Sequence, residues 1–120
     1  IISPMAHTKL EIREDIGWLT IDDGKVNALS AGLLRELEAQ LERTRREARV
    51  TVLTGRPGIL SAGFDMATFQ RGAEPTRAML LAGIAVIEKI LTQPHPVITG
   101  CAGHAFPMGA FLMLSADLRY

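Results

Sequence analysis

The 120-residue sequence predicts an α/β fold built on a mainly parallel sheet. Two segments in which apolar side chains recur every second residue come first, and a helix pattern follows them. Two further pairs of a short apolar run and a helix pattern complete the order, which is typical of parallel strands joined by right-handed crossovers. No low-complexity tract or linker interrupts the sequence. We therefore expect one core domain over residues 9–120, preceded by a tail or extraneous remnant over residues 1–8.

Charge and composition argue against several functions. Lys plus Arg and Asp plus Glu number 13 each, which leaves no basic field for a nucleic acid backbone. Cys101 is the only cysteine, so the chain can form no internal disulfide, and a reducing, cytoplasmic location fits. The longest apolar run, residues 78–87, is far shorter than the roughly 20 residues of a membrane-spanning helix. We expect a soluble protein that binds neither nucleic acid nor membranes.

The first third of the chain is expected to form a hairpin and a helix. Residues 9–15 and 17–22 both alternate in side-chain character, which predicts two antiparallel strands. The polar stretch 22–24 ends the second strand. Ser30 is a good N-cap, and the helix expected after it spans residues 31–47. Its apolar stripe consists of Leu34, Leu37 and Leu41.

The middle of the chain is expected to hold a strand and a second long helix. Residues 50–54 are β-branched or apolar without polar alternation, which predicts a strand covered on both faces. A turn at residues 55–58 follows, and after it the pair Ala62-Gly63 allows close approach of backbone or ligand. Residues 76–91 show a helix pattern that two prolines stop.

The last third begins with a short strand, residues 97–99, that leads through a glycine-bearing turn into an apolar helix, residues 108–114. The first N–H groups of such a helix lack partners and point beyond the sheet edge. Pro107 suits the first helical position, so Met108 should offer a free N–H. The alternative is a buried strand–helix unit whose glycines only permit close packing. N–H groups after Gly63 are candidates for a second donor, with an ordinary loop as the alternative.

Three motifs occur in order along the chain. They are Lys25-Val26-Asn27-Ala28-Leu29-Ser30, Leu60-Ser61-Ala62-Gly63-Phe64-Asp65-Met66, and the stretch from Pro96-Val97-Ile98 through Gly103-His104-Ala105 to residues 115–120. With them the chain resembles the crotonase (enoyl-CoA hydratase/isomerase) superfamily from about Leu10 onward. The resemblance implies a crotonase-like spiral of ββα units that assembles into trimers or hexamers. It also implies a truncated chain, which holds the N-terminal part of an acyl-CoA-binding core domain.

The resemblance implies a site as well as a fold. In this superfamily two backbone N–H groups stabilise the enolate of an acyl-CoA thioester, and the matching positions here are Phe64 and Met108. The loops that receive the adenine and pantetheine of coenzyme A would contain Val26, Ala28, Ala62, Asp65 and Met66. Coenzyme A would enter as part of the substrate, without a covalently bound cofactor, and no metal-ligand spacing is present.

Two departures from the family pattern bear on the reaction. Relatives have two or three glycines where this chain has Pro107-Met108-Gly109, so we expect the Met108 side chain to narrow the acyl pocket. Phe111 stands where hydratases place the first of two catalytic glutamates, and a benzyl group cannot carry a proton. The second glutamate would lie beyond Tyr120. We expect an isomerase-like or divergent enzyme rather than an ordinary hydratase; the alternative is a catalytically inactive acyl-CoA-binding or assembly protein.

The other ionisable candidates are expected to be structural or exposed. His95 lies between two prolines and His104 follows a glycine in the turn, and a surface or hydrogen-bonded role is the simplest for both. Glu88 belongs to the solvated edge of its helix. Asp117 begins the last expected strand, residues 117–120, at a position that we interpret as structural. A flavodoxin-like half-domain, a further alternative, lacks the phosphate-loop glycine pattern that it requires.

Overall fold

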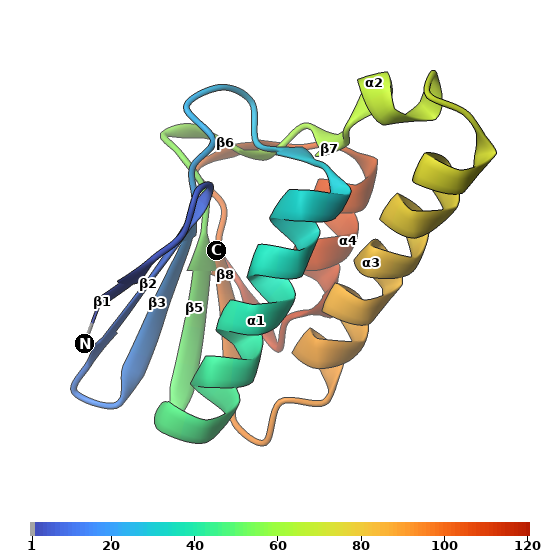
Figure 1. The fold of residues 1–120 in the computed structure, drawn as a ribbon. Helices are drawn as coiled ribbons and strands as arrows, with labels where there is room; N and C mark the ends of the chain where they lie inside the picture. Colours follow the sequence, from blue (N-terminus) through green and yellow to red (C-terminus); the bar gives the residue numbers. More distant parts are fainter. Residues whose placement is uncertain (1) are drawn as a thin grey trace.

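The structure, a computed structural model that describes residues 2–120, is a six-stranded sheet with helices packed on one face (Figure 1). Two small two-stranded sheets lie beyond one end of the large sheet. The strands are β1 (Ile2–Pro4), β2 (Thr8–Arg13), β3 (Ile16–Ile21), β4 (Ala28–Leu29), β5 (Val50–Thr54), β6 (Gly58–Ser61), β7 (Gly63–Phe64), β8 (Val97–Gly100), β9 (Gly103–Ala105) and β10 (Leu118–Arg119). The helices are α1 (Ala31–Glu47), α2 (Met66–Phe69), α3 (Ala73–Leu91) and α4 (Pro107–Ser115).

The large sheet has the strand order β1-β2-β3-β5-β8-β10. Strands β1, β2 and β3 pair antiparallel along one edge, whereas β3, β5, β8 and β10 run parallel to one another. The small pairs β4–β7 and β6–β9 are parallel as well. The predicted α/β fold with a mainly parallel sheet is therefore confirmed.

The hairpin β2–β3 turns through Glu14 and Asp15, whose φ angles are 51° and 67°. A two-residue loop with two positive φ angles matches the right-handed twist of the strands that it joins. Leu10 and Leu19 pair across the hairpin and are buried in the core. The predicted hairpin is present, and its period of two directs these side chains toward the helices.

Helix α1 has the bounds that the sequence predicts. The Ser30 side chain accepts a hydrogen bond from the Leu33 N–H at 3.2 Å, which satisfies one of the unpaired donors of the first turn. The helix packs on β2 and α3 through fully buried side chains. These are Leu33, Leu34, Leu37 and Leu41, which share one core with Leu53 and Val86.

Two expectations about the sheet need correction. Residues 2–4, expected in a tail, form β1 and pair with β2, while residue 1 of that tail lies outside the described residues. Strand β5 is not covered on both faces, because Thr51 and Leu53 are buried but Val52, between them, stays partly exposed. A β-branched composition predicts the strand without saying how many of its faces are covered.

The short strands β4, β6, β7 and β9, helix α2 and the first turn of α3 escape the sequence pattern. Helix α2 and strand β9 are too short to show a period. Helix α3 begins at Ala73 rather than at Thr76, with Pro75 in its first turn. Proline is tolerated there because the first turn needs no backbone N–H.

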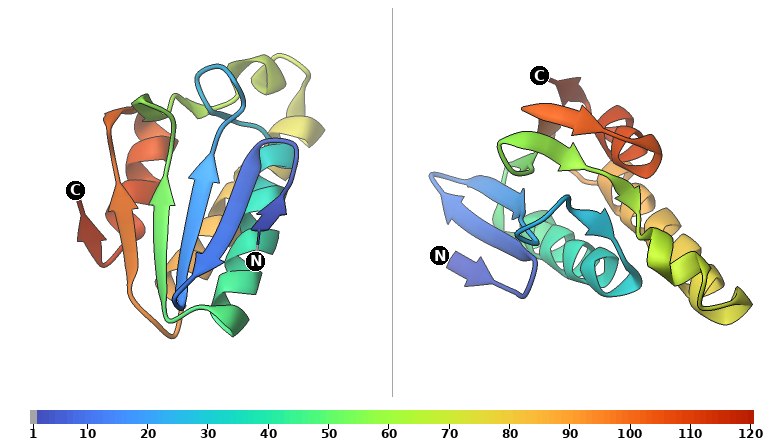
Figure 2. Two further views of the ribbon diagram at one scale, coloured as in Figure 1. Left: turned by 90° about the vertical axis from the view of Figure 1, so that its left-hand side faces the viewer. Right: turned by 90° about the horizontal axis from the view of Figure 1, so that it is seen from above.

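The parallel strands β3, β5 and β8 all end at the edge of the sheet that adjoins the small sheets (Figure 2). The segments after these ends are residues 22–30, 55–66 and 101–109, and they carry most of the three motifs. In open parallel sheets, ligands bind beyond the carboxyl ends of the strands. The fold therefore gathers the motifs where a ligand site is expected.

Candidate functional site

Strands β4 and β7 join the first two motifs. Ala28 pairs with Gly63 in parallel register, and the Ala62 N–H donates to the Val26 carbonyl at 2.9 Å. Asp65 directly follows β7. The structure therefore brings together four of the five residues predicted to hold coenzyme A, although they come from two separate motifs.

Helix α4 begins beside β7 with no side chain capping its first turn. Pro107 occupies the first position, as predicted. Among residues 2–120, the Met108 N–H has no hydrogen-bond partner. Its nitrogen lies 3.6 Å from the position that a Cβ atom on Gly63 would occupy. A free backbone donor thus adjoins the second motif.

The backbone N–H groups of β7 point alternately to its two edges. The Asp65 N–H donates to the Leu29 carbonyl at 3.2 Å, on the side of β4. Successive N–H groups of a strand point to opposite edges, so the Phe64 N–H points away from β4, to the edge where α4 begins. Gly63 has a φ of +91°, a backbone conformation that residues with a side chain rarely adopt. This conformation sets the path of β7.

The side chains of Phe64 and Met108 lie in the interior. Met108 is 3% exposed and belongs to the hydrophobic core, against which Phe64 packs. Both reach Gly83 of α3, where an added Cβ would lie 2.8 Å from Phe64 Cζ and 3.0 Å from Met108 Cε. The Met108 side chain is a packing group between α3 and α4, and the expectation that it narrows an acyl pocket stays a prediction.

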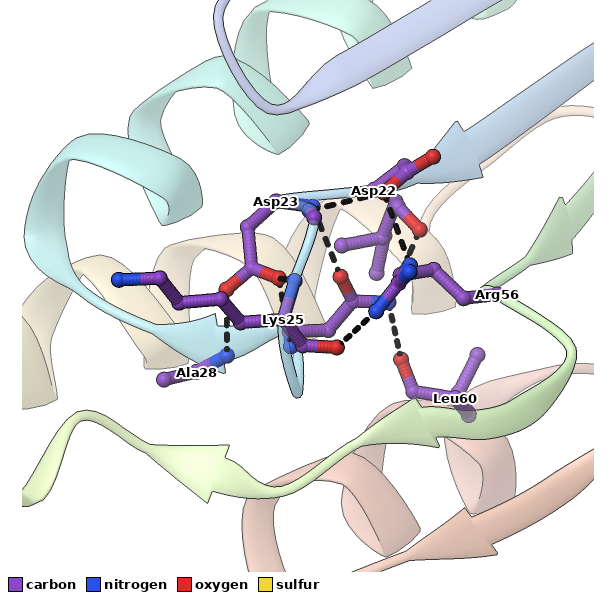
Figure 3. Close-up of polar contacts among 9 residues, drawn as sticks. Asp22, Asp23, Lys25, Ala28, Arg56 and Leu60 are labelled. Atoms are coloured by element: carbon purple, nitrogen blue, oxygen red, sulfur yellow. Dashed lines mark hydrogen bonds and ion pairs between the residues drawn. The ribbon is translucent and has the colours of Figure 1, made fainter.

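Asp23 organises the loop that carries Val26 and Ala28 (Figure 3). Its carboxylate accepts hydrogen bonds from the N–H groups of Lys25, Asn27 and Ala28 at 2.7, 3.0 and 3.3 Å. Burial raises the pKa of Asp23, but these three donors together lower it by more, so the pKa falls below its ordinary value. The loop therefore closes around a carboxylate held in its charged form.

Asn27 links this loop to β6 from a fully buried position. Its amide nitrogen donates to the Ile21 carbonyl at 2.9 Å and to the Leu60 carbonyl at 3.0 Å. Its amide oxygen accepts from the Asp23 N–H at 3.0 Å. The φ of Asn27 is +55°, a left-handed conformation that asparagine adopts more readily than most residues.

Arg56, in the turn that precedes β6, also holds the loop of residues 22–30. Its guanidinium forms an ion pair with Asp22 at 3.0 Å and donates to the Lys25 carbonyl (Figure 3). Sequence reasoning missed Asp23, Asn27 and Arg56 as site-building residues. The available signal was the pair of aspartates before a glycine, because such side chains bond to the backbone two residues on.

A cleft of about 280 Å³ runs along the first motif. Its lining includes Ala28 and Asp65 together with Lys25 and His7. The two predicted coenzyme A residues thus share one hollow with Lys25, whose ammonium could meet a phosphate, and with the charged Asp23 carboxylate.

A second cleft, of about 360 Å³, lies between the start of α1 and α2 and also includes Asp65. Arg35 and Arg71 line it, and both side chains are exposed with no partner among the described residues. Val26 is 51% exposed and Met66 is 72% exposed, and neither lines these two clefts. Of the five predicted coenzyme A residues, Ala28 and Asp65 therefore line the first cleft, and Asp65 alone also lines the second.

His95 and Asp117 make structural hydrogen bonds. His95 Nε2 lies 2.7 Å from the Thr51 hydroxyl. Burial lowers the pKa of His95, while the negative charge of Asp117 raises it by less. The Asp117 carboxylate accepts a hydrogen bond from the Val97 N–H at 2.8 Å and so holds the start of β8. Both residues have the structural role that the sequence predicts.

The remaining candidates lie at the surface. His104 is exposed and stacks on Phe106 with ring centroids 5.4 Å apart, and Glu88 is exposed on α3. Phe111 is 54% exposed on α4. Within residues 2–120, no group of three or more His, Cys, Asp and Glu side chains is placed to hold a metal ion. No helix of that part is long and apolar enough to cross a membrane.

The family model for enoyl-CoA hydratase/isomerase matches residues 11–120. The chain belongs to this family. A probable enoyl-CoA hydratase of Rhodobacter capsulatus is 35% identical over 115 residues, which are 93% of this chain and 45% of that protein. A Bacillus subtilis protein of the same name is 29% identical over 114 residues, or 92% of this chain and 44% of its own length.

Solved structures of the family share the fold. A probable enoyl-CoA hydratase of Mycobacterium tuberculosis superposes with a TM-score of 0.88 at 34% identity, covering 93% of this chain and 48% of that one. An enoyl-CoA hydratase/isomerase family protein of Pseudomonas syringae gives 0.88 at 35% identity, covering 92% and 48%. The crotonase fold is therefore shown, and the chain spans about half the length of the relatives that it matches.

Proposed function

We propose that the complete protein binds an acyl-CoA thioester and stabilises its enolate through the backbone N–H groups of Phe64 and Met108. When a base takes the proton from the carbon beside the thioester carbonyl, the electron pair moves onto the carbonyl oxygen. Two N–H donors aimed at that oxygen stabilise the charge as it develops, and such preorganised donors are often the largest single contribution to catalysis.

The observation that carries this proposal is the free Met108 N–H beside Gly63, at the edge of β7 to which the Phe64 N–H points. Both donors belong to the backbone, so neither depends on a side chain. The Met108 N–H also lies in the first turn of α4, where the helix dipole favours negative charge. These features support a site for a developing oxyanion.

Coenzyme A is proposed as part of the substrate. The cleft that contains Lys25 and the adjoining cleft that contains Arg35 and Arg71 offer cations to its phosphates. The residues proposed to receive its adenine and pantetheine are Val26, Ala28, Ala62, Asp65 and Met66. Their closeness around β4 and β7 supports this assignment.

Within the family, we place the reaction among isomerase-like or divergent activities rather than ordinary hydration. Phe111 of α4 stands where the resemblance to hydratases places a catalytic glutamate. Its benzyl side chain cannot act as a general acid or base. The same residue favours a second candidate, a catalytically inactive acyl-CoA-binding or assembly protein. The two candidates differ in whether the bound thioester loses a proton.

Assembly and location complete the proposal. We propose a homo-oligomer, a trimer or a hexamer, on the basis of the family resemblance, and a cytoplasmic location. The apolar side chains that α4 leaves exposed, Phe111 and Leu114, support burial of this face in the complete assembly. The single free cysteine fits a reducing compartment.

The test compares Met108→Pro with Met108→Ala in the complete protein. Both variants remove the side chain from the core, but only proline removes the N–H. We expect proton exchange of butyryl-CoA into D₂O, followed by NMR, to be about 10²–10³-fold slower in Met108→Pro than in Met108→Ala. Unfolding midpoints recorded alongside separate this loss from lost packing.

Two results would contradict the proposal in different ways. If Met108→Pro folds and exchanges the substrate proton as fast as Met108→Ala, the Met108 N–H does not stabilise the enolate. If the wild type binds acyl-CoA but does not exchange its proton, the second candidate, an inactive acyl-CoA-binding protein, is correct.

A further inference from the structure

Ser61 is the fully buried residue at which the three segments of the site meet. We propose that Ser61 is a positioning residue, whose hydroxyl and carbonyl groups hold both backbone donors in place. This inference rests on the function proposed above and adds to it the residue that aligns the two N–H groups.

The hydroxyl connects the coenzyme A loop to the strand of the first donor. It donates to the Asn27 carbonyl at 2.7 Å and accepts from the Gly63 N–H at 3.0 Å. Because Ser61 has no exposed surface, water cannot take over either bond. Gly63 directly precedes Phe64, so its two backbone dihedral angles orient the Phe64 N–H. The bond to the Gly63 N–H anchors one end of that residue.

The main chain of Ser61 holds the second donor. Its carbonyl accepts from the Phe106 N–H at 3.0 Å, just before α4. Gly109, in the first turn of α4, comes so close that an added Cβ would lie 2.8 Å from the Ser61 carbonyl oxygen and 3.0 Å from Ser61 Cβ. Met108 lies between these two contacts. Ser61 therefore contacts the backbone on both sides of the Met108 N–H.

Removing the hydroxyl leaves the Gly63 N–H buried without a partner. The backbone of β7 can recover a hydrogen bond only by moving, and this movement displaces the Phe64 N–H. A misplacement of about 1 Å at a catalytic group can cost about 10²-fold in rate. A serine with only a structural role would lower stability and leave the rate of the folded protein unchanged.

The experiment compares Ser61→Ala with Thr44→Val in the complete protein. Thr44 is also fully buried, and its hydroxyl donates to the Leu41 carbonyl at 2.9 Å near the end of α1 that is remote from the site. We expect both variants to unfold at lower urea concentration. Only Ser61→Ala should lower kcat for butyryl-CoA proton exchange, by about 10- to 100-fold.

Two further measurements sharpen this comparison. The Kd of coenzyme A should change less than about threefold in Ser61→Ala, because the loss falls on the transition state rather than on binding. Ser61→Cys, whose thiol is a weak donor and acceptor, should recover part of kcat. A kcat that is equal in Ser61→Ala and Thr44→Val overturns the positioning role and leaves the proposed function standing.

Amide hydrogen exchange provides a readout that does not depend on catalysis. The Gly63 and Phe64 amides should exchange faster in Ser61→Ala than in the wild type, and should be unchanged in Thr44→Val. If the wild type exchanges no substrate proton, the proposed function fails, and these amides alone decide the role of Ser61. Unchanged Gly63 and Phe64 amides in Ser61→Ala would then overturn it.

Discussion

Helix α1 and the layer of short strands beyond the sheet are held by different forces. On α1, fully buried leucines pack against the sheet and α3. In the layer formed by β4, β6, β7 and β9, the organising side chains Asn27 and Ser61 are polar and bond to the backbone. Hydrophobic contact is non-directional, whereas a hydrogen bond fixes both distance and angle. A site made of backbone N–H groups needs the second kind of support.

A large loss of stability is expected on the α1 side, from Leu37→Ala. Leu37 is fully buried, so the variant loses buried surface and leaves a cavity, which should lower the free energy of unfolding by about 2–5 kcal/mol. Urea unfolding measures this loss, and Ala39→Ser, at an exposed position of the same helix, serves as the control. Coenzyme A affinity of the folded protein should be unchanged. A loss no larger than that of Ala39→Ser would contradict the packing described for α1.

A loss of comparable size is expected in the site layer, from substitutions of Asn27. Asn27→Gly keeps the left-handed backbone but leaves the Ile21 and Leu60 carbonyls without their donor. Each buried group left unsatisfied costs about 1–3 kcal/mol. Asn27→Ala should lose about 1 kcal/mol more, because alanine is strained at positive φ.

Coenzyme A binding separates this loss from the loss at Leu37. Asn27 holds the loop of Ala28, so calorimetric titration with coenzyme A should show weaker binding in both Asn27 variants and unchanged binding in Leu37→Ala. Equal coenzyme A affinities in all three variants would show that the loop of Ala28 does not depend on Asn27 for binding.

The same contrast explains how far the sequence predicts the fold. The leucine period and Ser30 predict α1 with its observed bounds, and the β-branched run predicts β5 with its own. Strand β1 is three residues long and has no period, yet it pairs with β2 because that edge is free to accept a partner. Pattern reasoning succeeds where packing is periodic, and it misses elements that are too short to show a period.

The sequence also predicts some features of the site and misses others. Pro107 predicts the free Met108 N–H, because that inference needs only the geometry of a helix start. The direction of the Met108 side chain was not predictable, since α4 is apolar on nearly every side and offers no polar face to orient it. The hydrogen bonds of Ser61 to Asn27 and Gly63 could not be predicted from the sequence for another reason. They join residues that lie up to 34 positions apart, and no local pattern records them.

The smallest expected effect concerns the charge of Asp23 in the site layer. Burial raises its pKa, but the N–H groups of Asn27, Lys25 and Ala28 lower it by more, so the folded protein binds the proton more weakly than the unfolded chain. The stabilisation is present above the ordinary pKa of about 4 and is lost as the pH falls through the folded value. Acid should therefore lower the free energy of unfolding. The effect is small because Asp23 is partly exposed and water screens its charge.

Urea unfolding between pH 5 and pH 3 of the wild type and of Asp23→Asn measures this contribution. The wild-type curve alone is insufficient, because Lys89 lowers the pKa of Glu42 and Arg43 lowers that of Glu47, and both act in the same direction. These surface groups are unchanged in the variant, so the difference between the two curves isolates Asp23. We expect the variant to lose less stability in acid, and parallel curves would contradict the role of the carboxylate. Since the same carboxylate closes the loop of Ala28, coenzyme A affinity of the wild type should fall over the same pH range.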